Sequence, residues 1–189
     1  SRSCCIFVLM KKLKITEMVR LTQEDYHQSK KLPILLVLDD LRSMNNVGSI
    51  FRTADAFRLE GLYLCGITAC PPHTDIHKTA LGAEESVPWR YFADRAEALG
   101  ELQAEGYHLL ALEQAHGSVS LEAFTPQPNQ RYALILGNEV RGVHEDFMQA
   151  VDTCLEIPQL GTKHSLNVSV ATGIALWQLV SPLLSSLDR

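Results

Sequence analysis

Polar side chains recur at every second position in one otherwise apolar segment near the carboxyl end of the chain. Ser165, Asn167 and Ser169 follow Ile157, Pro158 and a glycine-containing loop, and they open a run of apolar residues. One such side chain is enough to cap a helix, because it accepts a hydrogen bond from a free N–H group of the first turn. Two interpretations fit the polar residues beyond the one needed as a cap: they are small residues that allow tight helix packing, or they form one wall of a ligand site.

A second polar set lies where the first predicted strand turns into a helix. Asn45, Asn46 and Gly48 mark this turn, and Arg52 follows in the second turn of the helix. An asparagine at the cap and an arginine further along can converge on one anion. Taken alone, Arg52 also fits a solvated helix arginine whose aliphatic stem packs on the surface.

The third set follows another predicted strand. Gly137 permits close backbone approach, and Asn138, Glu139, Arg141 and Gly142 come directly after it. The carboxylate of Glu139 either caps the next helix, fixes a ligand ribose or orients a basic group. The sequence contains neither the Gly-x-Gly-x-x-Gly pattern nor the Gly-Lys-Ser/Thr pattern of common nucleotide-phosphate sites.

Alternating strand-like and helix-like segments must position these three sets. Continuous apolar runs predict strands at 34–38, 62–65, 107–112, 132–136 and 154–157. Helical spacing predicts helices at 47–57, 94–105, 147–151 and 165–184, the last with a kink at Pro182. This order predicts one α/β domain with a mostly parallel sheet flanked by helices. Ligands of such sheets bind beyond the carboxyl ends of the strands, where all three polar sets fall.

Composition narrows the class of protein. A chain of 189 residues can bury a core without cross-links, and its net charge of -5 argues against a strongly basic nucleic-acid binder while leaving a local basic patch open. Five cysteines, with Cys4 and Cys5 adjacent, do not form a disulfide framework, which favours a reducing, cytoplasmic location.

No apolar run reaches the roughly 18 residues of a membrane span. An apolar run followed by lysines reverses the order of an export signal. Met10 could be the natural start, with residues 1–9 an extension.

The three polar sets together resemble a known family. Asn46-x-Gly48-x-x-x-Arg52, then Leu-Gly-Asn-Glu at 136–139, then the segment 157–171 resemble the three motifs of the TrmH/SpoU branch of the SPOUT RNA methyltransferases. The likeness covers residues 33–181, including the stretch 78–83 between motifs. It implies a SPOUT-type α/β knot, with a deep trefoil knot at the carboxyl end, and S-adenosylmethionine as cofactor. It also implies a homodimer with the active site at its interface, and methyl transfer to a ribose 2′-hydroxyl of RNA. Residues 1–32 are then an N-terminal extension, and 33–189 the catalytic domain.

The resemblance also implies roles for single residues. Arg52 acts on the 2′-hydroxyl, and the site around it is arranged by Asn46, Glu139, Ser165 and Asn167. Because a guanidinium has a pKa above about 12, stabilising developing negative charge or gripping a phosphate is a better role for Arg52 than removing the proton. The cofactor is expected near Leu112, Gly137, Ile157, Ser165 and Leu166.

RNA is the expected partner, and cationic side chains are expected to bind it. The extension contains a basic arm, expected to be helical, with Lys11, Lys12, Lys14, Arg20, Lys30 and Lys31. Around the motifs we expect contributions from Arg42, Arg58, Arg141, Lys163 and His164. The alternative is a solvated charged surface. The chain shows no large appended RNA-binding domain, which favours transfer RNA over ribosomal RNA as substrate.

Two other functions fit parts of the sequence. Cys65, Cys70, His73 and His77 have donor types that suit zinc, but only Pro71 and Pro72 separate the middle pair, so we expect no metal site. A non-catalytic RNA-binding or assembly module of the same fold is the other alternative. The presence of Arg52, Glu139, Ser165 and Asn167 argues against it.

Overall fold

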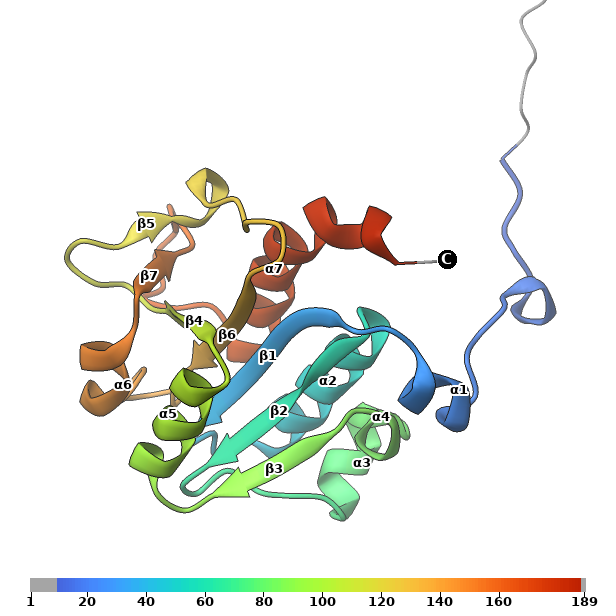
Figure 1. Ribbon diagram of the computed structural model, residues 1–189, viewed down its shortest axis with the longest axis horizontal. Helices are drawn as coiled ribbons and strands as arrows, with labels where there is room; N and C mark the ends of the chain where they lie inside the picture. The colour runs from blue at the N-terminus through green and yellow to red at the C-terminus, as the bar shows by residue number, and fades with distance from the viewer. Residues whose placement is uncertain (1–9, 188–189) are drawn as a thin grey trace, which may run out of the picture.

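Seven parallel strands form the centre of the protein. The computed structural model describes residues 10–187 (Figure 1). The strand order in the sheet is β3-β2-β1-β6-β4-β7-β5, and every pair of neighbouring strands is parallel. In chain order the strands are β1 Leu32–Asp39, β2 Leu59–Cys65, β3 Trp89–Phe92, β4 Tyr107–Leu112, β5 Val119–Ser120, β6 Arg131–Leu136 and β7 Thr153–Glu156.

Helices cover both faces of the sheet. The α-helices are α1 Gln23–Gln28, α2 Met44–Ala56, α3 Thr74–Ala80, α4 Ala83–Ser86, α5 Arg95–Ala104, α6 Glu145–Ala150 and α7 Val168–Val180. Short 3-10 helices cover Ile15–Glu17, Leu121–Ala123 and Ser181–Ser186. The α/β class with a parallel sheet flanked by helices is therefore confirmed. The trefoil knot stays a prediction.

The core has two parts, one on each face of the sheet. Along β1, Ile34, Leu36 and Leu38 pack into the cluster under α2, α3, α4 and α7, whereas Leu35 and Val37 pack into the cluster under α5 and α6. Side chains of a strand point alternately to opposite faces, so a strand covered on both faces must be apolar throughout. This is why the central strands are predictable from continuous apolar runs.

The predicted elements are confirmed, with shifted ends, and the chain contains further elements. The strands at the ends of the sheet, β3 and β5, were not predicted, and neither were α3 and α4. These elements are short: β5 has two residues, and α4 has four. The predicted helical form of the basic arm is wrong in detail, because its helical segments are only Ile15–Glu17 and Gln23–Gln28, and neither contains any of the arm's six cations.

The final helix begins later than predicted. Its first residue is Val168, and Asn167 is the N-cap, so Ser165 lies in the preceding loop and not in the helix. The kink expected at Pro182 takes the form of a change of helix type, since the α-helix ends at Val180 and a 3-10 helix follows. Proline lacks the N–H group that would continue the α-helical ladder.

The same segment changes one expectation about membranes. Val168–Ser186 spans 19 residues with a mean hydropathy of 1.5, and by length and composition alone it could cross a membrane. This is weak evidence, because core helices pass the same test. Here Ala175, Leu176 and Leu179 are fully buried against the sheet, but only 28% of the apolar stretch is buried, so this packing accounts for only part of its apolar character.

Candidate functional site

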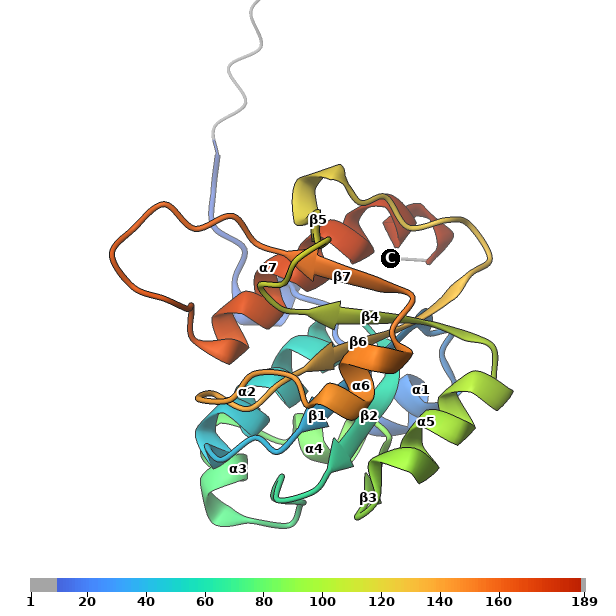
Figure 2. The same ribbon diagram turned by 90° about the vertical axis from the view of Figure 1, so that its left-hand side faces the viewer.

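A large pocket lies beyond the carboxyl ends of three neighbouring strands. Loops that follow β4, β6 and β7 surround a cavity of about 760 Å³. Figure 2 shows the loops after β6 and β7 leaving the same edge of the sheet. This is where open parallel sheets bind ligands, and the volume lies within the usual range of about 300–1,000 Å³ for small-molecule sites.

The residues predicted to hold a cofactor all line this pocket. They are Leu112, Gly137, Ile157, Ser165 and Leu166, and they come from the end of β4 and from the loops after β6 and β7. Ser165 is exposed, and Leu166 is 38% exposed. A hydroxyl and an apolar side chain are therefore accessible on the same pocket wall. The structure brings the set together, while its binding role stays a prediction.

A chain of side-chain hydrogen bonds joins the three sequence motifs. The amide of Asn167 donates to the side-chain oxygen of Asn46 at 3.1 Å. The amide of Asn46 donates in turn to the carboxylate of Glu139 at 3.3 Å. Residues more than 90 positions apart in sequence thus fix each other's orientation beside the pocket.

Glu139 caps a helix, but not the one that follows it in sequence. Its carboxylate accepts hydrogen bonds from the backbone N–H groups of Arg42 and Ser43, both at 3.0 Å, at the start of α2. Partial burial raises the pKa of Glu139, but these two N–H groups and the Asn46 amide together outweigh it and hold the pKa below its usual value. The carboxylate is therefore ionised and occupied, which makes it a poor proton acceptor and a good positioning group.

Asn167 has a comparable capping role at the other helix of the site. Its side-chain oxygen accepts from the N–H groups of Ser169 and Val170 at 2.9 and 3.2 Å, at the start of α7. The hydroxyl of Ser169 donates to the same oxygen at 2.6 Å. Two of the three recurring polar residues are thus explained by capping, and Ser165 remains as an exposed hydroxyl on the pocket wall.

Arg52 lies outside the pocket. It is exposed on α2 and forms no hydrogen bond or ion pair among residues 10–187. Gly48, one turn before it, allows α2 and α3 to touch, because a Cβ there would lie 2.2 Å from the carbonyl oxygen of Ile76. Arg52 is free to reach a ligand that extends beyond the pocket along α2.

The predicted RNA-binding residues do not all gather at the site. Arg141 and His164 line the pocket, and Lys163 and Arg42 are exposed in adjoining segments. Arg58 follows the carboxyl end of α2, whereas the polar chain lies at the amino end of that helix. Two cations of the arm are engaged elsewhere: Lys30 donates to the Ser186 carbonyl at 3.0 Å, and Lys31 to the Ser29 carbonyl at 2.8 Å.

Sequence reasoning missed several polar residues of the pocket, among them Glu113 and Gln114. Glu113 accepts from the Val143 N–H at 3.0 Å, and the Gln114 amide donates to the His164 carbonyl at 2.6 Å. Each side chain therefore ties the loop after β4 to one of the other two loops. Their position directly after a buried strand was the available signal.

The four zinc-type donors are not assembled into a site. Cys65 is buried in β2, His73 caps α3 by accepting from the Asp75 N–H at 3.1 Å, and His77 forms a hydrogen bond with Glu84. Within residues 10–187, no three His, Cys, Asp or Glu side chains are placed to hold a metal ion.

Comparisons with known proteins agree on one family. Residues 33–177 match the SpoU rRNA methylase family. The 23S rRNA (guanosine-2'-O-)-methyltransferase RlmB of Haemophilus ducreyi is 32% identical over 84% of this chain and 63% of its own length. The chain thus spans about three fifths of that relative.

Solved structures share the fold. A crystal structure of an AdoMet-bound rRNA methyltransferase from Sinorhizobium meliloti is 28% identical, with a TM-score of 0.73, over 82% of this chain and 58% of that one. A structure that concerns 2-OH methylation of C/U34 on tRNA is 27% identical, with a TM-score of 0.71, over 82% of this chain and 99% of that one.

Proposed function

The chain belongs to the SpoU rRNA methylase family, and from that premise we propose that it methylates a ribose 2′-hydroxyl of RNA with S-adenosylmethionine as the methyl donor. The observation that carries the proposal is the hydrogen-bonded chain from Asn167 through Asn46 to Glu139 at the edge of the pocket. These bonds link the three motifs to one another. If the three residues only capped helices, no hydrogen bonds between the motifs would be needed. A non-catalytic RNA-binding module remains the alternative.

The pocket suits S-adenosylmethionine in size and in chemistry. Leu136, Ile157 and Val168 supply apolar surface for a nucleoside, and Glu113 and Glu139 supply negative charge for a ligand that carries a sulfonium and an amino group. The three loops would hold the cofactor with Leu112, Gly137, Ile157, Ser165 and Leu166. When bound, the cofactor supplies a methyl group that its sulfonium already activates.

The protein's own task is to orient a weakly nucleophilic hydroxyl. Asn46, in the first turn of α2, and Asn167, on the pocket wall, have side chains fixed by their mutual hydrogen bond. Arg52, exposed on the same helix, would stabilise negative charge on the ribose oxygen or hold the neighbouring phosphate. It keeps its own proton, because deprotonating a guanidinium is costly. Glu139 acts as a positioning group.

We propose ribosomal RNA as the substrate class in place of transfer RNA. The expectation of transfer RNA rests on the shortness of the region before β1. Because the chain spans only about three fifths of its curated relative, the shortness of this region does not favour transfer RNA. The relative with the higher identity is named for 23S rRNA, and the structure that concerns tRNA is 27% identical. We also propose a cytoplasmic location.

A second copy of the chain is the proposed partner of α7. Val170, Ile174 and Trp177 are spaced at four and three residues, so they form one stripe along the helix. They are 53%, 42% and 55% exposed, which leaves an apolar surface beside the pocket without cover among the described residues. A homodimer through this stripe would place the partner next to the loop that contains Ser165.

The test separates enzyme from binding module. Wild-type protein, Arg52→Ala and Arg52→Lys are compared for S-adenosylmethionine binding by calorimetry and for labelled methyl transfer to ribosomal or transfer RNA. We expect all three to bind the cofactor equally, and transfer to ribosomal RNA to fall at least about 100-fold in Arg52→Ala. Cofactor binding without transfer to any RNA by the wild type would favour the non-catalytic module.

A further inference from the structure

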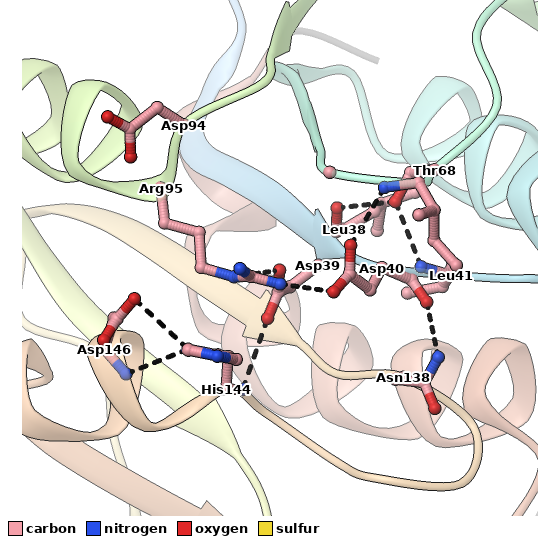
Figure 3. Close-up of polar contacts among 12 residues, drawn as sticks. Leu38, Asp39, Asp40, Leu41, Thr68, Asp94, Arg95, Asn138, His144 and Asp146 are labelled. Carbon is pink, nitrogen blue, oxygen red and sulfur yellow. Dashed lines mark hydrogen bonds and ion pairs between the residues drawn. The ribbon is translucent and has the colours of Figure 1, made fainter.

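An arginine outside the pocket bridges two adjacent carboxylates at the end of β1. The Nε group of Arg95, the first residue of α5, donates to Asp39 at 2.7 Å, and its terminal nitrogen donates to Asp40 (Figure 3). The Asp39 side chain is 1% exposed and that of Arg95 19%. Arg95 is not among the residues that line the pocket.

Both aspartates are also bonded to the loop that follows β6, which lines the pocket. The second carboxylate oxygen of Asp39 accepts from the N–H of His144 at 3.2 Å. The carbonyl oxygen of Asp40 accepts from the Asn138 amide at 2.7 Å. The segment between these two attachment points, residues 138–144, contains Glu139. Figure 3 shows Asn138 and His144 on opposite sides of the Asp39–Asp40 pair.

Inside the loop, Asn138 also forms hydrogen bonds with the backbone of neighbouring residues. Its side-chain oxygen accepts from the N–H groups of Val140 and Arg141 at 2.9 and 3.0 Å. Its backbone exchanges two hydrogen bonds with Gly142, at 3.0 and 2.9 Å. A displacement of Asp40 would therefore move the backbone that forms one wall of the pocket.

We propose that Arg95 is a positioning residue for this methyltransferase, which sets the loop 138–144 and through it the cofactor pocket and Glu139. The expected effect on cofactor binding rests on the proposed function. The positioning of the loop rests on the hydrogen bonds described above. Two carboxylates on neighbouring residues repel each other, and burial raises the pKa of Asp39 while Arg95 opposes that shift. Without Arg95, Asp39 takes up a proton or turns outward, and the bond to His144 is weakened.

A neighbouring ion pair provides a matched control. Arg90, on β3, forms an ion pair with Glu101 on α5, so it attaches the same helix to the sheet. Neither residue lines the pocket or forms a hydrogen bond with the loop 138–144 within the part of the chain that the structure describes. Arg90→Met therefore tests whether attachment of α5 alone affects the site.

The experiment compares wild type, Arg95→Met, Arg95→Lys and Arg90→Met. It measures the Kd for S-adenosylmethionine by calorimetry and amide hydrogen exchange in residues 138–144, after circular dichroism has confirmed folding. We expect Arg95→Met to weaken binding about tenfold or more and to speed exchange in the loop about tenfold. Arg95→Lys, which keeps a charge but not the forked geometry, should recover part of both losses, and Arg90→Met should match the wild type.

Each outcome decides the proposal. Arg95→Met with wild-type binding and exchange overturns it, and so does an equal loss in Arg90→Met. If Arg95→Met does not fold, Arg95→Lys carries the test, and wild-type behaviour of that folded variant in both measurements overturns the proposal. If the wild type binds no cofactor, the proposed function fails, while the exchange measurement still decides whether Arg95 positions the loop.

Discussion

Replacing Glu139 with glutamine perturbs the site at the position where two motifs meet. One carboxylate oxygen serves the N–H of Arg42, and the other serves the N–H of Ser43 and the amide of Asn46. Glutamine retains one acceptor oxygen, so at least one of these donors must face an NH₂ group. A hydrogen bond to a charged group contributes about 1.5–3 kcal/mol, and because this site is partly open to water we expect a loss of about 1–2 kcal/mol.

The loss should be visible in thermal unfolding. For a chain of this size, 1 kcal/mol corresponds to about 2–4 °C in Tm, so Glu139→Gln should unfold about 2–8 °C below the wild type at pH 7. The folded-state pKa of Glu139 is lowered, so its stabilising contribution is present above the usual glutamate pKa of about 4.3. The difference in Tm should shrink as the pH falls below that value, through the lower folded-state pKa.

A second glutamate separates this cap from a general charge effect. Glu145 lies in the first turn of α6, and its carboxylate accepts only from the Gln149 amide, at 3.1 Å, among the residues that the structure describes. Glu145→Gln should therefore lose no more than about 0.5–1 kcal/mol from the helix dipole. Equal decreases in Tm for the two variants, or a Glu139→Gln difference that persists unchanged at low pH, would refute the reasoning.

Three other variants test the remaining parts of the account. Asn167→Ala should lose about 1 kcal/mol from the cap of α7 in chemical unfolding, whereas Asn167→Asp keeps the cap oxygen and should lose methyl transfer with little change in stability. Trp177→Lys should convert a dimer to a monomer in sedimentation velocity; an unchanged dimer would exclude the α7 stripe. Replacing Lys11, Lys12 and Lys14 with alanine should reduce the salt slope of RNA affinity by about 0.7–0.9 for each phosphate that these lysines neutralise, and an unchanged slope would exclude the basic arm.

The sequence predicted those elements whose local pattern reports their burial. β1 and β6 are covered on both faces, so each is a continuous apolar run. β3 is an edge strand with the sequence Trp-Arg-Tyr-Phe, of which only Phe92 is buried, and nothing in such a segment distinguishes a strand from a loop. The pairing of β3 with β2 was therefore decided by tertiary contacts.

The site was predictable in its members but not in its connections. The three motifs identified Asn46, Glu139 and Asn167, and the order of strands placed them at one edge of the sheet. That Glu139 caps α2, whose cap residue Ser43 lies 96 positions earlier, depends on how the strands are ordered in space. Arg95 lies 56 residues from Asp39, and no local pattern links two charged residues at such a separation.

Ribose methylation across the RNA of the source organism tests the central claim most directly. Every 2′-O-methyl position is mapped in cells with the protein, in cells without it, and in cells that carry Arg52→Ala. The account predicts that one position in ribosomal RNA loses its methyl group without the protein and does not regain it with the variant. Retention of every ribosomal and transfer RNA position would contradict the account.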